Sequence, residues 1–216
     1  MKRSVLALLA TLSIFALACG FFDSEIATVT YEGDFPLEFS IDASDLCPSG
    51  SDCEDNQQPA NEDVELALIE FAIPLDLAEH ATIREGGVEV NARDVLSRMR
   101  TLEITSIDYV VSDNDLTFDL PPMELYVAPL SVDDPEHSQS IHLTTMPSVP
   151  ADTDASENAP TRSEAVDPAS DLFKTLEFNA IPSAQPVVKE GQPFPPSGSA
   201  DTEITVNFRI TANPLD

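Results

Sequence analysis

Two cysteines in the first half of the chain stand close enough to react with each other. Cys47 and Cys53 are separated by five residues in the polar, acidic segment CPSGSDC. Outside the cytoplasm such a pair tends to form a local disulfide, whereas a zinc site would need further Cys or His ligands nearby. We therefore predict a Cys47–Cys53 disulfide that makes this loop rigid, with a stabilisation of about 2 kcal/mol or less.

Acidic residues near the middle of the chain suggest a cation site. The segment 112–119 contains Asp113 and Asp115, whose carboxylate oxygens are ligands that calcium prefers, so these two residues are calcium candidates. The segment lacks the glycine and the distant glutamate of an EF-hand loop. Because Asp-Asn-Asp is equally typical of a hairpin turn, the turn is the favoured interpretation.

No pattern in the sequence predicts catalysis or a cofactor. There is no Gly-x-Ser-x-Gly segment and no glycine-rich phosphate loop. His137 and His142 are spaced so that both could approach one ion, but no third ligand accompanies them. Carboxylates are so numerous that choosing two of them as a glycosidase pair would be arbitrary. We expect a protein without enzymatic activity, cofactor or resident metal.

The amino-terminal residues MKRSVLALLATLSIFALACG have the organisation of an export signal. Lys2 and Arg3 precede an uncharged, mostly apolar run of about fourteen residues that ends at Ala18. A membrane-spanning helix needs about 20 apolar residues, so this run is too short to remain as an anchor. The leader therefore predicts export of the remaining chain.

The end of the leader, Ala16-Leu17-Ala18-Cys19-Gly20, resembles the lipobox of bacterial lipoproteins. The resemblance implies that residues 1–18 are removed, that Cys19 carries the lipid, and that residues 19–25 form a tether. Gly20 rather than Asp after the cysteine implies sorting to the outer membrane. The alternative is an ordinary small-residue cleavage site that Cys19 merely follows, and Ala16, where the lipobox usually carries Leu, favours that alternative.

Composition narrows the range of partners. The chain has 39 Asp and Glu residues against 10 Lys and Arg residues, and its formal net charge is −29. Nucleic-acid binding and peripheral attraction to anionic lipid both depend on basic side chains, so neither is expected. The predicted partners are the membrane, through the lipid on Cys19, and an unidentified protein or glycan.

Short segments with alternating apolar and polar residues predict a mainly β protein. The expected strands cover residues 26–31, 35–42, 102–111, 116–120, 125–127, 141–145 and 204–210. The alternation changes phase between Ile104 and Ile107, which predicts a β-bulge. Turn residues at 112–115 predict a hairpin over residues 102–120.

Few segments predict helix. Asn91 can cap a short helix over residues 92–100, and residues 171–178 can add one or two helical turns. Residues 64–77 are expected to be extended, because Pro74 would interrupt a helix. Residues 146–170 are rich in Pro, Ser, Ala and acids without apolar periodicity, so we expect a long disordered loop or flexible insertion there.

These elements favour a single β-sandwich over residues 26–216, with one or two short helices and the long loop. The alternative is an α+β domain in which the helix near residues 92–100 packs on an antiparallel sheet. For function, the sequence favours a lipid-anchored, non-enzymatic cell-envelope protein that acts as a binding or structural module. The alternatives are an envelope hydrolase that uses paired carboxylates and a calcium-dependent adhesion module.

Overall fold

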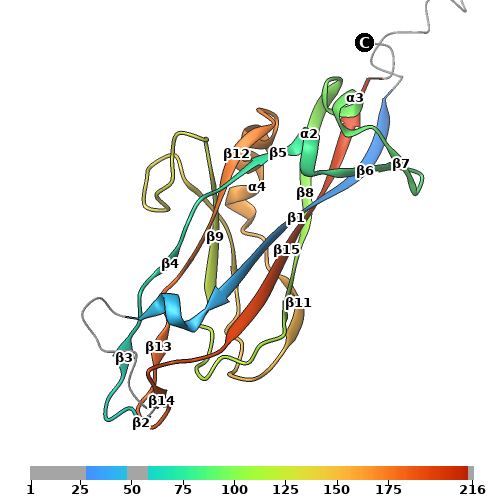
Figure 1. The fold of residues 1–216 in the computed structure, drawn as a ribbon. Helices are drawn as coiled ribbons and strands as arrows, with labels where there is room; N and C mark the ends of the chain where they lie inside the picture. The colour runs from blue at the N-terminus through green and yellow to red at the C-terminus, as the bar shows by residue number, and fades with distance from the viewer. Residues whose placement is uncertain (1–27, 48–57, 214–216) are drawn as a thin grey trace, which may run out of the picture.

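The computed structural model describes residues 28–47 and 58–213. Two large antiparallel sheets pack around one continuous hydrophobic core and form a β-sandwich (Figure 1). This architecture confirms the predicted mainly β class, because the strands contain far more residues than the helices.

The larger sheet has six strands, and its central strands come from the two ends and the middle of the chain. Its order is β11 (Ala155–Ala159), β8 (Met99–Ser112), β15 (Ser199–Ala212), β1 (Val29–Asp42), β6 (Thr82–Glu85) and β7 (Val88–Val90).

The smaller sheet has five strands, and two of them share one neighbour. Its order is β10 (Ile141–Met146), β9 (Met123–Ala128), β12 (Glu177–Ala184) and β4 (Ile69–Glu70), with β5 (Ile73–Asp76) also paired to β12. Two short ribbons lie beyond it: β13 (Val187–Val188) with β3 (Val64–Glu65), and β14 (Pro193–Phe194) with β2 (Gln58–Pro59). The helices of the described residues are η1 (Ala43–Leu46), α2 (Leu77–His80), α3 (Ala92–Leu96) and α4 (Ser163–Phe173).

A cluster of phenylalanines ties both sheets to α4. The ring of Phe35 on β1 lies 5.5 Å from that of Phe173 on α4, 5.8 Å from that of Phe178 on β12 and 6.0 Å from that of Phe208 on β15, measured between centroids. All four side chains are essentially inaccessible to solvent. Because aromatic rings bury large apolar areas, this cluster is a main source of stability between the layers.

Strand β1 is a single strand where the sequence predicted two. The predicted strands over 26–31 and 35–42 are joined through Gly33, which lies opposite Phe208 of β15. A Cβ at Gly33 would lie 2.4 Å from Cε2 of Phe208, so the glycine provides the space in which that ring packs. Residues 26 and 27 lie outside the described residues.

The predicted bulge in β8 is confirmed. Ser106 pairs with Asn207 of β15 while Ile104 pairs with Phe208, so Thr105 is the additional residue. An extra residue reverses the facing of those that follow, which accounts for the change of phase in the sequence.

The predicted hairpin over residues 102–120 is wrong. Strand β8 pairs with β15 and β11, and residues 113–119 form no strand. Leu116, Phe118 and Leu120 are nevertheless buried, as their alternation indicates. The backbone of this segment bonds to distant loops, for example from Asp115 N to Ser199 O at 3.0 Å. The alternation therefore predicted correctly which residues are buried, but not which part of the chain they contact.

The predicted disorder of residues 146–170 is also wrong. Strand β11 pairs with β8 along the edge of the larger sheet, and α4 begins at Ser163. The helix buries Ala165, Ala169 and Phe173. Alanine contributes little to an apolar pattern, and Pro168 lies inside the helix. The sequence pattern therefore did not indicate the helix α4.

Two further predictions are refined by the structure. Asn91 caps α3 as expected, with its Oδ1 accepting a hydrogen bond from Asp94 N at 3.1 Å. The helix ends at Leu96, and Met99 already belongs to β8, so the prediction of a helix to residue 100 was too long. Residues 64–76 are extended as predicted, in three short strands.

Candidate binding surface

Most residues singled out for covalent chemistry lie outside the described part of the chain. Cys19 and Cys53 lie outside the described residues, so lipidation and the Cys47–Cys53 pairing stay predictions. Cys47 directly follows η1 and forms its carboxy-terminal cap. Within the described ranges, no helix is long and apolar enough to cross a membrane.

The calcium candidates lie in the loop that follows β8. Asp113 has a positive φ of 49°, and Oδ1 of Asp115 accepts a hydrogen bond from Ser199 N. Between them, the buried Asn114 donates from Nδ2 to Thr153 O at 2.6 Å and accepts at Oδ1 from Leu116 N at 3.2 Å. Among the described residues no group of three or more His, Cys, Asp or Glu is placed to hold a metal ion. These bonds fix the segment in the loop that follows β8, and the hairpin turn that the sequence favoured does not form.

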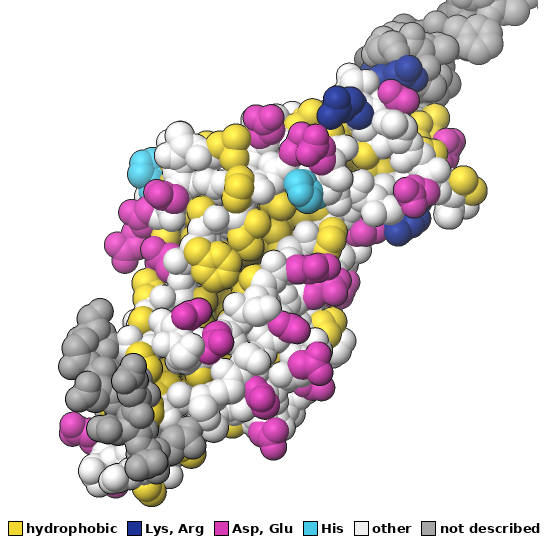
Figure 2. All heavy atoms as spheres, viewed as in Figure 1, with side chains coloured by type: hydrophobic (Ala, Val, Ile, Leu, Met, Phe, Trp, Pro, Cys, Tyr) yellow, Lys and Arg dark blue, Asp and Glu magenta, His cyan; other side chains and the backbone are white. Residues whose placement is uncertain are grey.

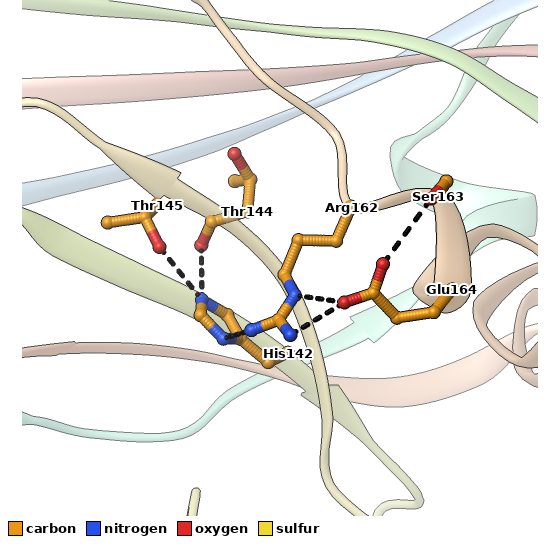
Figure 3. Close-up of polar contacts among 6 residues, drawn as sticks. All are labelled: His142, Thr144, Thr145, Arg162, Ser163 and Glu164. Atoms are coloured by element: carbon orange, nitrogen blue, oxygen red, sulfur yellow. Dashed lines mark hydrogen bonds and ion pairs between the residues drawn. The ribbon is translucent and has the colours of Figure 1, made fainter.

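His142 is held by neighbours on both sides of its ring (Figure 3). Its Nε2 lies 2.9 Å from Thr144 O and 3.1 Å from Thr145 Oγ1, while Nδ1 contacts Nη1 of Arg162. A carbonyl oxygen can only accept, so Nε2 carries the hydrogen and Nδ1 accepts from the guanidinium. Arg162 in turn binds Oε1 of Glu164 through Nε and Nη2 at 2.9 and 2.6 Å. Both ring nitrogens are thus committed within the chain.

An aromatic ring packs on the face of the His142 imidazole. The ring of Tyr126 stacks on that of His142 with centroids 4.7 Å apart, and its hydroxyl donates to Glu124 Oε2 at 2.7 Å. Burial, followed by the bond to Glu124, raises the pKa of Tyr126 to about 12. His137, whose spacing from His142 would have allowed both to approach one ion, instead accepts at Nδ1 from Gln139 N. The two histidines therefore have separate roles, each within its own turn or strand.

Acidic side chains surround the outer edge of the smaller sheet. Burial raises the pKa of Glu70 on β4, and the nearby charges of Asp134, Glu136 and Asp133 raise it further. Like charges disfavour ionisation of one another, so these loop carboxylates keep a concentrated negative potential at this edge.

Apolar side chains are exposed on the open side of the sandwich, between β1 and β4. Phe39 of β1 contacts Phe71, which follows β4, with ring centroids 5.3 Å apart in an edge-to-face arrangement. Phe71 is 37% exposed and Leu68 is 47% exposed. Figure 2 shows hydrophobic side chains gathered along the middle of this face, with acidic side chains on both sides of them. We call Phe39 and Phe71, together with the exposed Leu68 three residues before Phe71 in the sequence, the apolar patch.

An unpaired strand edge borders this patch. Strand β6 pairs with β1 only at residues 32–34. From residue 35 to residue 42, the side of β1 that faces away from β15 pairs with no strand of the described part. Unpaired backbone groups at a sheet edge are a template for another strand.

Sequence reasoning missed the apolar patch. The segment Val64–Leu77 has more apolar residues than one buried face of short strands can hold, since Leu66 and Ile69 are buried while Leu68 and Phe71 are not. This excess of apolar residues could have indicated an exposed apolar surface. The contact between Phe71 and Phe39 could not have been predicted, because it joins residues far apart in the sequence.

Comparison with known proteins identifies no family. No family model and no curated protein matches the chain. A solved structure from Desmodium yellow mottle tymovirus is similar at 11% identity and a TM-score of 0.31, covering 85% of this chain and 89% of that chain. One from black queen cell virus is similar at 9% identity and a TM-score of 0.32, covering 89% and 75%. One from infectious bursal disease virus strain Gx has 12% identity and a TM-score of 0.26, covering 82% and 37%. Because these TM-scores are low, the fold assignment rests on the strand pairing described above.

Proposed function

We propose that the protein is a lipid-anchored, non-enzymatic cell-envelope protein that binds an extended segment of another protein. Cys19 would carry the lipid, with residues 19–25 as the tether, and Gly20 favours the outer membrane. Several acyl chains on one residue hold a protein firmly at a bilayer, because each buried CH₂ contributes about 0.8 kcal/mol.

The observation that carries the binding role is the apolar patch beside the unpaired edge of β1. A peptide that adds a strand to a sheet edge gains main-chain hydrogen bonds, and apolar side chains in adjacent hollows supply specificity. Phe39 and Phe71 offer such contacts directly next to residues 35–42 of β1. Exposed apolar patches rimmed by polar residues are typical of protein-interaction sites.

The charge of the protein indicates the composition of the bound segment. The net charge of −29 and the carboxylates near Glu70 favour a segment that carries basic residues among its apolar ones. The predicted disulfide involves Cys47, which directly follows η1. A bridge to Cys53 would make the loop that follows η1 rigid.

The anchor is tested by Cys19→Ser. We expect the variant to move from the membrane fraction to the soluble fraction and to lose labelling by radioactive palmitate. Unchanged fractionation with unchanged labelling would contradict the lipoprotein assignment, whatever the binding surface does.

The binding surface is tested by a photo-reactive amino acid placed at position 68, with position 88 as the control. Val88 on β7 is also an exposed apolar residue, at 68%, but it lies away from the apolar patch. We expect one discrete cross-linked protein adduct in intact cells from position 68 and none from position 88. The adduct should be lost when Phe71→Asp is added. Equal adducts from both positions, or an adduct that survives Phe71→Asp, would refute the surface.

A further inference from the structure

The outer face of the larger sheet has a hollow of about 310 Å³ at the bulge of β8. Its lining comes from four strands, β1, β6, β8 and β15, and includes Thr105 and Ser106 of the bulge. Bulges redirect side chains and interrupt pairing, and they are over-represented next to functional sites. The hollow is separate from the apolar patch, which faces the open side of the sandwich.

Opposite charges alternate in one row of this face. The strand register places Glu32 of β1 directly between Arg84 of β6 and Arg209 of β15. The row continues to Glu89 of β7 on one side and to Glu103 of β8 on the other. Two of the few basic residues in a strongly acidic chain therefore line one hollow.

Two carboxylates on the floor of the hollow are held in place by neighbours. Asp108 accepts at Oδ1 from Asn158 Nδ2 at 2.9 Å and at Oδ2 from Asn207 Nδ2 at 2.7 Å. Asp34 forms an ion pair with Arg84. Arg209 is less constrained, because its contact with Glu103 is 3.6 Å long and its side chain is 49% exposed. Fixed carboxylates beside a half-exposed guanidinium are a preorganised polar arrangement.

The lining excludes several kinds of ligand. Phe208 is 1% exposed, so no aromatic face is offered for stacking of a sugar or base. A purely anionic ligand would meet Glu32, Asp34 and Asp108, and a purely cationic one would meet both arginines. A ligand with one charge of each sign can satisfy both groups.

We infer that this hollow binds a small dipolar molecule with a free carboxylate and a free ammonium group, of the size of an amino acid or a dipeptide. The carboxylate is placed on Arg209, and the ammonium group on Asp34 and Asp108. Guanidinium and carboxylate form charge-assisted hydrogen bonds, which are stronger than neutral ones. The inference does not depend on the protein-binding role proposed above.

Calorimetric titration of the full chain in detergent tests this, with three probes that differ only at their ends. We expect L-alanyl-L-alanine to bind at least about tenfold more tightly than its N-acetylated form or its C-terminal amide, because each blocked end leaves charged groups unpaired. Arg209→Gln should reduce the affinity for the free dipeptide by about tenfold or more. Arg93→Gln is the matched control, since Arg93 is 71% exposed and lies outside the hollow.

Three results would overturn the inference. They are equal affinity for the free and blocked dipeptides, undiminished binding in Arg209→Gln, and no heat of binding for the free dipeptide up to about 10 mM. Circular dichroism of Arg209→Gln should match that of the unchanged protein, so that lost binding is not mistaken for lost folding.

Discussion

The outer face of the larger sheet is electrostatically different at its two ends. Near β6, Arg84 and Arg209 alternate with acids along one row, so each charge faces an opposite one. Towards the other end, Glu38 of β1 lies directly opposite Glu203 of β15, and Asp201 follows. No Lys or Arg lines the second hollow there, of about 300 Å³. We call these the balanced end and the acidic end.

The excess of acidic residues is therefore not distributed evenly over the outer face of the larger sheet. Opposite charges across a strand pair contribute roughly 0.2–1 kcal/mol, whereas like charges directly opposite are destabilising. The same two strands, β1 and β15, provide both arrangements. The acidic end therefore lowers stability locally, and the balanced end does not.

The inner faces of the two ends differ as well. Below the balanced end, Gly33 makes room for Phe208, which belongs to the phenylalanine cluster. Below the acidic end lies Thr202, whose Oγ1 is buried without a hydrogen-bond partner in the described part of the chain. Substitutions that disturb apolar packing should therefore have the larger effect at the balanced end. At the acidic end, like charges and the unpaired hydroxyl of Thr202 should matter more.

The largest effect is expected from Phe173→Ala, which removes a ring from the cluster below the balanced end. Phe173 is fully buried, and its ring lies 4.5 Å from that of Phe178. We expect the free energy of unfolding to fall by about 3–5 kcal/mol in urea titrations followed by circular dichroism. A loss below about 1 kcal/mol would mean that α4 contributes little to the core.

Gly33→Ala should have the next largest effect, by forcing Phe208 out of its position. We expect a loss of about 1–3 kcal/mol, since overpacking displaces neighbouring side chains. The double variant with Phe208→Leu should recover part of this loss, which a double-mutant cycle will measure. Strict additivity of the two changes would show that the two residues do not compete for the same space.

At the acidic end, Thr202→Val should stabilise the protein. It replaces a buried hydroxyl that has no partner with a methyl group of similar shape, and we expect a gain of about 1 kcal/mol. Thermal unfolding by calorimetry provides the measurement. A loss of stability would indicate that the hydroxyl is hydrogen-bonded in solution.

Charge substitutions on the outer face should have opposite signs at the two ends. Glu203→Lys replaces a like pair with an opposite pair and should stabilise by about 0.5 kcal/mol, whereas Arg209→Glu should destabilise by a similar amount. Both effects should shrink in about 1 M NaCl, because salt screens exposed charges. Equal effects at low and high salt would show that packing, not charge, separates the two ends.

The smallest effect is expected at Glu70 on the smaller sheet. It tests whether repulsion between neighbouring carboxylates lowers stability there as it does at the acidic end. The pKa of Glu70 is raised above the ordinary value of 4.5. At pH values between 4.5 and this raised pKa, the folded protein therefore binds more protons than the unfolded chain. Its contribution to stability therefore falls as pH rises through that window and stays lower above it. Glu70→Gln should raise the Tm by about 1–2 °C at pH 7 and leave it unchanged near pH 4. The same rise at both pH values would exclude ionisation of Glu70 as the cause.

Local patterns in the sequence predicted local structure well. The alternation of residues 204–210 lies inside β15, the phase change near Ile104 marks the bulge, and Asn91 caps α3. Each of these depends on neighbouring residues alone. Predictions failed where a distant partner decides the outcome. Leu116, Phe118 and Leu120 are buried but do not pair with β8, and α4 is ordered by the sheets against which it packs.

The candidate sites were harder to predict for the same reason. Glu32, Arg84 and Arg209 are remote in sequence and meet only through the register of three strands. Phe39 and Phe71 meet only across the opening between the sheets. The cysteine pair, by contrast, could be proposed at once because its members are neighbours in the chain.

The position of β15 has a consequence for how the chain reaches its folded state. This strand lies between β1 and β8 in the larger sheet, although it is formed by residues 199–212. A chain that emerges from a ribosome or a translocation channel with its amino terminus first cannot join β1 to β8 until residue 212 has emerged. Closing so large a loop is slow, so the chain would remain open, and accessible to chaperones, until β15 has emerged and paired.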